Sequence, residues 1–159
     1  MTEQARQPVF YAEYGVPDTV DGRFEMIALH MFLVLQRLRA LGEDELAQQL
    51  FDTMFADMDQ SLREMGAGDL GVGRRVRAMA EGLYGRISAY EDGLAGDDQR
   101  LMAALRRNLF GTVAEPGPGT AALQPLCAYL RSAAASLQSQ TAAAIRAASL
   151  HFPPPSEGR

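Results

Sequence analysis

The chain has 159 residues and a mass of 17.3 kDa, enough for one folded domain but not for two substantial cores. Apolar residues make up 47% of it and charged residues 22%, a composition that excludes both a disordered chain and one embedded in a membrane. The formal net charge is −5, which argues against DNA as a partner, because nucleic-acid binders need cationic surface. We expect a globular protein that is soluble and cytoplasmic.

Few residues could hold a metal ion or a prosthetic group. Cys127 is the only cysteine, so a disulfide framework and a thiolate cluster are excluded. His30 and His151 are the only histidines, which excludes a three-histidine site within one chain. We therefore expect no metal and no cofactor, and we expect Cys127, which lies among leucines and alanines, to be an inert buried thiol.

The N-terminal residues show neither a secretory signal nor a helical period. Residues 1–8 lack the basic and apolar layout of a signal peptide. Phe10, Tyr11 and Tyr14 follow, close to Gly15 and Pro17, so residues 1–18 are predicted to form an extended arm that lies on the surface through its aromatic rings.

Residues 19–112 carry the helical pattern and are predicted to form the core of the domain. A first helix begins among residues 18–21 and ends near Leu41, before Gly42. Its apolar run, residues 26–35, would span about 15 Å, half of a membrane's hydrocarbon core, which favours a buried helix over a membrane segment. A second helix from residue 43 to Gly66 has the clearest apolar stripe: Leu46, Leu50, Phe51, Met54, Phe55, Met58, Leu62 and Met65.

Two more helices are predicted to complete this core. A helix-breaking run then separates the core from an alanine-rich C-terminal region. Asp69 could cap a helix that continues through Ile87, and residues 97–98 begin one that reaches Leu109. The run Glu115–Gly119 is the strongest helix breaker in the chain. Residues 120–152 are rich in alanine and predict one helix that packs on the core, with Pro125 either in its first turn or at the end of a short lead-in. Residues 153–159 are predicted to be a loose tail.

These patterns predict an all-α, single-domain bundle of five or six helices. No stretch alternates apolar and polar residues in the manner of a strand.

The second helix carries several carboxylates that could suggest a magnesium site. Asp57 and Asp59 diverge by about 200° on a helix, so one ion cannot bind both without distortion. Asp52 and Asp59 share a face, but that face is opposite the apolar stripe. A solvated acidic face is the favoured interpretation, and a magnesium-dependent site for isoprenoid pyrophosphates is the alternative.

Charge is segregated along the chain more clearly than any motif. Residues 43–69 hold eight acidic residues and one arginine, a net charge of −7, whereas residues 74–86 hold a net charge of +3. Between them lies a glycine-rich turn, residues 66–73, which follows a helix rather than the strand that a phosphate-binding loop requires. The two segments could pair with each other, or the arginines could contact an anionic partner such as the ribosome or an anionic membrane surface.

Other residues allow both a structural and a functional interpretation. His30 lies in the apolar first helix without a nearby nucleophile, which favours a hydrogen-bonded core or interface histidine over a general base. The methionines of the first three helices suit a core, but they also suit a groove that binds varied apolar partners. Gly82 and Gly85 could let another backbone approach, as in a homodimer.

Several short strings within residues 9–90 form a recognisable combination: Phe10-Tyr11, Gly15-Val16-Pro17-Asp18-Thr19, Gly22-Arg23-Phe24-Glu25, Leu29-His30, Phe55-Ala56-Asp57-Met58-Asp59, Leu62-Arg63-Glu64-Met65-Gly66, Gly68-Asp69-Leu70, Val72-Gly73 and Gly85-Arg86. Through this combination the sequence resembles the ubiquinol–cytochrome c chaperone family over residues 9–90. The chain has arginine where some lysine is expected after Gly73, and it lacks a transit peptide, as a compact bacterial member would.

The resemblance implies a helical, non-enzymatic assembly chaperone that holds newly made cytochrome b for the cytochrome bc complex, either in the cytoplasm or at the inner membrane face. It supplies no catalytic residues. The main alternative is an all-α protein or enzyme that binds isoprenoid or quinone lipid. The candidate partner-binding residues are Arg23, Phe24, His30, Asp57, Asp59, Arg63, Asp69, Arg74, Arg75, Arg77, Tyr84 and Arg86.

Overall fold

A computed structural model describes residues 1–64, 69–111 and 118–156, and the side chains of residues 58–59, 61–64, 69–77 and 79–80 lie outside this description. The described ranges contain helices and no strand, which confirms the predicted all-α class. Five helices are long and three are short. In chain order they are α1 (Thr2–Ala5), α2 (Pro8–Ala12), α3 (Val20–Ala40), α4 (Asp44–Glu64), α5 (Asp69–Ala95), α6 (Asp98–Leu109), α7 (Thr120–Gln138) and α8 (Ala142–Arg146).

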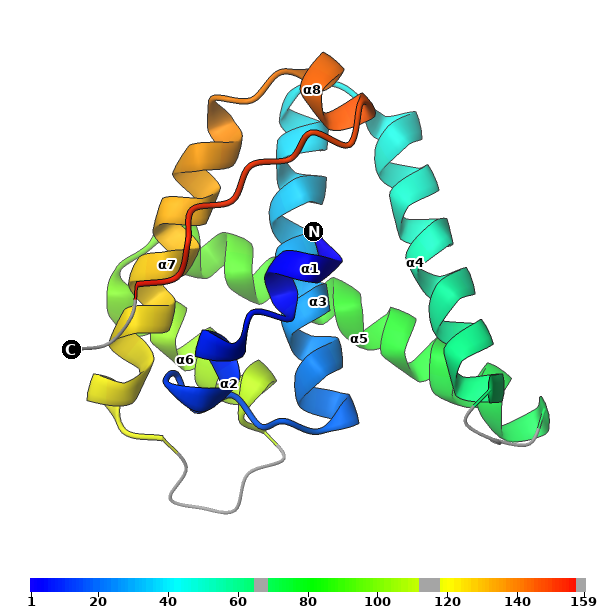
Figure 1. Cartoon of the computed structure of the whole chain (residues 1–159), viewed down its shortest axis with the longest axis horizontal. Helices are drawn as coiled ribbons and strands as arrows, with labels where there is room; N and C mark the ends of the chain where they lie inside the picture. The colour runs from blue at the N-terminus through cyan, green and yellow to red at the C-terminus, as the bar shows by residue number, and fades with distance from the viewer. Residues whose placement is uncertain (65–68, 112–117, 157–159) are drawn as a thin grey trace.

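Helix α3 forms the centre of the molecule, with the other long helices around it (Figure 1). It begins where the Thr19 side chain accepts a hydrogen bond from the Gly22 N–H, and it ends before Gly42, whose φ of +72° favours glycine. A Cβ atom at Gly22 would overlap the carbonyl oxygen of Pro17, so only glycine lets the chain enter α3 so closely. Most of α3 is buried, which explains why its apolar residues are not confined to one stripe.

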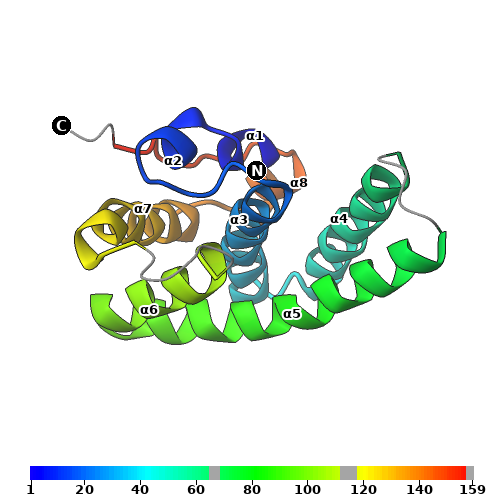
Figure 2. The ribbon, with the colours of Figure 1, turned by 90° about the horizontal axis from the view of Figure 1, so that it is seen from below.

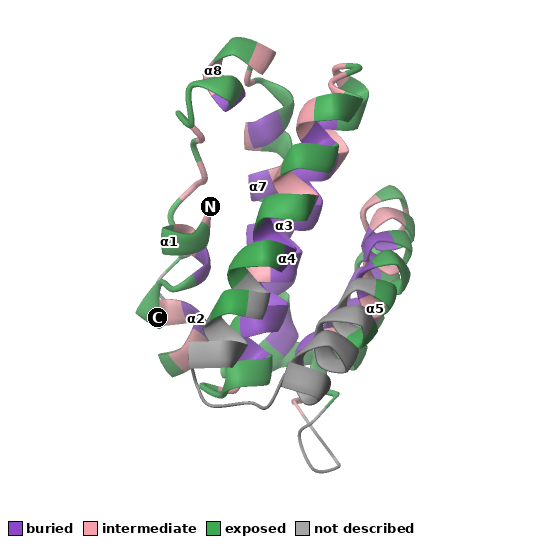
Figure 3. Cartoon of the chain, turned by 90° about the vertical axis from the view of Figure 1, so that its right-hand side faces the viewer, coloured by how far each residue is buried: buried purple, intermediate pink, exposed green. Residues whose placement is uncertain are grey.

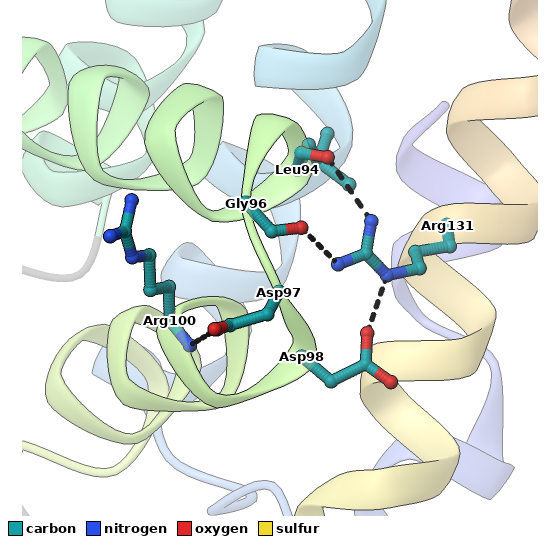
Figure 4. Close-up of polar contacts among 6 residues, drawn as sticks. All are labelled: Leu94, Gly96, Asp97, Asp98, Arg100 and Arg131. Carbon is teal, nitrogen blue, oxygen red and sulfur yellow. Dashed lines mark hydrogen bonds and ion pairs between the residues drawn. The ribbon is translucent and has the colours of Figure 1, made fainter.

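Helices α4 and α5 form a hairpin that extends away from α3, and α5 continues beneath the bundle to the turn into α6 (Figure 2). At this turn a Cβ atom at Gly93 would lie 2.9 Å from the Leu101 Cα atom, so glycine allows α5 and α6 to pack closely. Arg131 of α7 holds the turn: it donates to the Asp98 carboxylate and to the carbonyl oxygens of Leu94 and Gly96, at 2.7–3.1 Å (Figure 4).

The predicted extended arm is wrong in its conformation, because residues 2–5 and 8–12 form the short helices α1 and α2. Pro8 occupies the first turn of α2, where its fixed φ and missing N–H suit a helix. Phe10 is fully buried and Tyr14 is 3% exposed, so burial of these rings stabilises helices too short to persist alone.

The single C-terminal helix predicted over residues 120–152 is also wrong. Helix α7 ends at Gln138, and Thr141 then caps the separate short helix α8. Pro125 lies in the second turn of α7 rather than the first, where it forfeits one backbone hydrogen bond at about 3 kcal/mol. Burial of Leu123, Leu126 and Leu130 against the bundle offsets this loss.

The tail predicted to be loose is held against the N-terminal helices as far as the structure describes it. Gln4 donates to the Pro153 carbonyl at 3.1 Å, and the Tyr14 hydroxyl donates to the Ser156 carbonyl at 2.8 Å.

Helix α4 has an exposed outer face along much of its described length (Figure 3).

Candidate functional site

An apolar groove of about 530 Å³ lies between α1, α3 and α4. The half-buried side chains of Ile27 and Leu50 and the buried Met54 form its apolar wall. Leu50 and Met54 face it together because residues four apart share one side of a helix. The lining residues are Met1, Thr2, Arg6, Ile27, Leu50, Thr53, Met54, Asp57 and Gln60.

The groove has one positive and one negative rim. The exposed guanidinium of Arg6 comes from the residue after α1, and the exposed carboxylate of Asp57 comes from α4. Asp57 is thus the predicted partner-binding residue that the structure places at an apolar groove. Such a surface can hold an apolar segment and orient the charges that flank it.

A second hollow, of about 510 Å³, lies on the other side of Arg6 and is lined by Tyr11 and Arg23 among others. Arg23 donates to the Asp18 carboxylate at 2.6 Å, and this hydrogen bond lowers the pKa of Asp18. Burial raises the pKa of Tyr11, whose hydroxyl donates to the Ala5 carbonyl. The predicted residue Arg23 therefore lies beside the main groove rather than in it.

Two other predicted residues, Phe24 and Arg86, stabilise the interior. Arg86 of α5 makes two hydrogen bonds to the carboxylate of Glu25 on α3, and its guanidinium carbon lies 5.7 Å from the centroid of the Phe24 ring. Phe24 and Glu25 are each 7% exposed. Burial raises the pKa of Glu25 by more than the Arg86 charge lowers it, while the bond to Glu25 raises the pKa of Arg86.

His30 is a hydrogen-bonded core histidine, as the favoured interpretation predicted. Its Nδ1 lies 2.8 Å from the Met26 carbonyl, which can only accept, so Nδ1 carries the proton. Its Nε2 therefore accepts from the Tyr129 hydroxyl at 2.7 Å. Complete burial lowers the pKa of His30 to about 4, so the ring is neutral at pH 7. Its side chain is not accessible to a partner in this conformation.

Tyr84 of α5 lines a different hollow from the main groove. Its side chain is 60% exposed, the largest such value among the described bulky hydrophobic residues. The Tyr84 ring lies 5.7 Å from that of Phe51, and both line a small hollow of about 180 Å³ that includes Arg39. Tyr84 is therefore available for binding, but it is separate from Asp57.

The other predicted residues lie outside the described side chains. Helix α5 begins at Asp69 itself rather than after it. For the side chains of Asp59, Arg63, Asp69, Arg74, Arg75 and Arg77 the structure gives no position, so their roles stay predictions.

Among the described residues there is no cluster of three side chains that could hold a metal ion. Asp52 accepts a hydrogen bond from Gln48 and is not one of the groove-lining residues, so it does not converge with Asp57. No described helix is long and apolar enough to cross a bilayer. Cys127 is buried, as predicted, and burial raises the pKa of its thiol.

Sequence reasoning missed Arg6, Ile27 and Gln60 as groove residues, as well as Gln4 and Tyr129 around His30. No sequence pattern marked Arg6 and Gln60 as groove residues, because they line one groove only through the tertiary packing of the N-terminal helix and α4. The predicted stripe of α4 did include Leu50 and Met54, although it did not distinguish a core position from a groove position.

The family model of the ubiquinol-cytochrome C chaperone matches residues 12–152 of this chain. The chain belongs to the ubiquinol-cytochrome C chaperone family. This confirms the resemblance seen in residues 9–90 and extends it through the alanine-rich α7, which the sequence patterns did not connect with the family.

Two curated relatives are similar in sequence to this chain over about two thirds of its length. A ubiquinol-cytochrome-c reductase complex assembly factor 1 from Xenopus laevis is 30% identical over 102 residues, which are 63% of this chain and 51% of that protein. The mitochondrial protein CBP3 of Saccharomyces cerevisiae is 32% identical over 109 residues, covering 64% of this chain and 32% of CBP3. The chain thus spans about half or less of these two relatives.

The crystal structure of the Cbp3 homolog from Brucella abortus superposes with a TM-score of 0.80 at 40% identity. The superposition covers 96% of this chain and 83% of the homolog. Because the superposition covers nearly the whole chain, it supports the same helical fold for this chaperone-family chain.

Proposed function

We propose that this protein is a non-enzymatic chaperone that holds newly made cytochrome b during assembly of the ubiquinol–cytochrome c reductase complex. The family assignment supports the role in assembly, since the relatives are named assembly factors of that complex. The observation that carries the proposal is the apolar groove between α1, α3 and α4, because a chaperone for a membrane protein must cover an apolar segment.

The chemistry of the groove suits such a client. Leu50 and Met54 supply an apolar wall, and the flexible methionine side chain can adapt to different apolar side chains. Arg6 and Asp57, which both line the groove, would help to orient a client segment that has charged residues at its ends. Contact with the ribosome, contact with an anionic membrane surface and homodimerisation stay predictions.

The first test is recovery of the client. Affinity purification of the protein from growing cells, followed by mass spectrometry, should enrich cytochrome b over other membrane proteins. A deletion strain grown on a respiratory substrate should contain less of the complex. Normal levels of the complex in that strain would contradict the proposal.

The second test places the client in the groove. Thr53→Glu adds a negative charge to the exposed wall of the groove, and Gln48→Glu makes the same charge change at an exposed position on another face of α4 that does not line the groove. The first variant should lose most of the recovered cytochrome b and the second should keep it, with equal melting temperatures. Equal recovery by both variants would contradict the assignment of this groove.

A lipid-binding function is the alternative, and it makes a different prediction. An isoprenoid pyrophosphate with Mg²⁺ would raise the melting temperature of a protein that binds it. A flat titration favours the chaperone, whereas a saturable rise would favour the lipid-binding function.

A further inference from the structure

Five rings pack together where the N-terminal helices meet α3, α7 and the C-terminal segment. Phe10 lies edge-on to the rings of Tyr14, His30 and Tyr129, with centroids 4.9–5.7 Å apart. Phe152 completes the group, with its ring 5.3 Å from that of His30. The first four rings belong to the helical body and its N-terminal part, whereas Phe152 comes from a segment without helix or strand.

This segment, residues 150–156, is here called the C-terminal segment; it returns from α8 along α7 toward the N-terminal helices (Figure 1). Side chains of the helical part of the protein bind the main-chain groups of this segment. Gln140 donates to the His151 carbonyl at 2.6 Å and accepts from the His151 N–H at 3.0 Å. Gln4 donates to the Pro153 carbonyl, and Tyr14 donates to the Ser156 carbonyl.

The C-terminal segment has little conformational freedom to lose. Pro153, Pro154 and Pro155 fix φ near −65°, and a residue that precedes proline is biased toward extended backbone. Such a run favours the polyproline II conformation, which has no internal hydrogen bonds and presents its carbonyl oxygens to donors outside. Gln4 and Tyr14 are donors of this kind.

We propose that the aromatic groove formed by Gln4, Phe10, Tyr14, His30 and Tyr129 is a peptide-binding site that accepts an extended segment with an aromatic residue followed by prolines, and that residues 152–156 fill it in cis. Aromatic walls combined with donors to main-chain carbonyls are the elements by which proline-rich peptides are recognised. The ligand is an extended segment of another polypeptide that presents the same aromatic and proline pattern.

The contacts of residues 152–156 suggest that a segment of another polypeptide could replace them in the site. Within the described part of the chain, this segment makes its aromatic ring contact through Phe152, while Pro154 and Ser156 are exposed. Its hydrogen bonds use main-chain groups, apart from a 3.1 Å contact between the Tyr14 and Ser156 hydroxyls, so a different sequence could make them. A segment without helix or strand that makes few buried contacts opens locally at low free energy.

The site is independent of the proposed function. Its residues and those of the α1/α3/α4 groove do not overlap, so loss of client binding at that groove would leave this inference standing. The reverse also holds, because the test below uses purified protein and a synthetic peptide, without cytochrome b.

The test measures binding of a peptide with the sequence of residues 150–156, labelled with a fluorophore, to the full-length protein. The native chain competes through its own segment at an effective concentration of about 1 mM. In the full-length variant Phe152→Ala the anchor is absent while the groove is intact, so this variant should bind the peptide at least tenfold more tightly than the native chain. A peptide with alanine in place of its phenylalanine should bind at least tenfold more weakly, because it buries no ring.

Further substitutions locate the binding. Adding Tyr14→Phe to the Phe152→Ala chain removes one donor and should weaken peptide binding about fivefold. Adding Tyr84→Phe makes the same change far from the groove and should have no effect. Equal binding by the native and Phe152→Ala chains, undetectable binding by both, or equal binding with and without Tyr14→Phe would overturn the proposal.

A second measurement shows whether the segment is seated in solution. The chain contains no tryptophan, so full-length Phe152→Trp carries a single tryptophan reporter. Its fluorescence should be protected from iodide and should become accessible when excess unlabelled peptide is added. A tryptophan that iodide quenches freely without peptide would also overturn the proposal.

Discussion

Replacing Arg86 with methionine would leave the Glu25 carboxylate buried without its partner, with little change in side-chain volume. The two side chains join α5 to α3 through two hydrogen bonds, and they are 23% and 9% exposed. Removing one member of a buried ion pair destabilises a protein by about 3–5 kcal/mol. Because the Arg86 side chain retains some contact with water, we expect the lower end, about 3 kcal/mol at pH 7.

The loss should depend on pH in a defined direction. Burial already raises the pKa of Glu25 in the native chain, and removal of the Arg86 charge raises it further. A carboxyl group with a raised pKa in the folded state contributes most stability below its unfolded pKa, and this contribution is lost as the pH rises through the folded value. The deficit of Arg86→Met should therefore shrink as the pH falls from 7 toward 4.

The assay is urea unfolding followed by circular dichroism at each pH, with two comparisons. Adding Glu25→Gln to Arg86→Met removes the unpaired charge and should recover part of the loss at pH 7. Arg39→Met breaks an exposed pair with Glu91 at 3.7 Å and should cost less than about 1 kcal/mol. Equal midpoints for the native chain and Arg86→Met at pH 7, or a deficit independent of pH, would refute the reasoning.

Three further predictions concern the stability of variants at Gly22, Gly85 and His30. Gly22→Ala should destabilise the protein by about 1–3 kcal/mol in urea unfolding, since its Cβ atom would overlap the Pro17 carbonyl. Gly85→Ala should stabilise it by about 0.5–1 kcal/mol, because nothing lies within 4 Å of that Cβ position in α5, and a loss would contradict the packing described. His30 has a pKa of about 4 against an ordinary 6.5, so its burial as a neutral ring contributes about 3 kcal/mol of stability that is lost as the pH falls from 7 to 4, and His30→Gln should lose correspondingly less than the native chain over that range.

The long helices could be predicted because their signals are local. The Thr19 cap and Gly42 bound α3, and Asp97 caps α6 through its bond to the Arg100 N–H. Helices α1 and α2 were missed because so few residues carry no periodicity. Their stability depends on Phe10 and Tyr14 packing against residues more than a hundred positions later. The end of α7 was missed for a similar reason, since alanine favours helix and the Thr141 cap is a weak signal.

Sequence reasoning named one residue of the groove as a candidate, Asp57, because it belongs to the residues that carry the family resemblance. Its helix face did not mark it, since the carboxylates of this helix were interpreted as a solvated face. The groove itself requires α1 to pack on α3 so that its residues line the same hollow as residues of α4, which no local pattern encodes. Arg86 was expected to pair with the acidic residues 43–69 or to contact an outside anion, because sequence spacing cannot show that Glu25, sixty-one positions earlier, is its partner.

The absence of lysine is explained in part by what the described arginines do inside the fold. Arg37 donates twice to the Gln140 carbonyl, Arg86 makes two hydrogen bonds to Glu25, and Arg131 reaches three acceptors at one turn. A planar guanidinium can make such forked contacts, whereas an ammonium group acts as a point charge. A count of basic residues therefore overstates the charge available to an anionic partner. By this criterion Arg6 at the groove rim is a stronger candidate for an outside contact than Arg86, because no hydrogen bond or ion pair holds its side chain within the described structure.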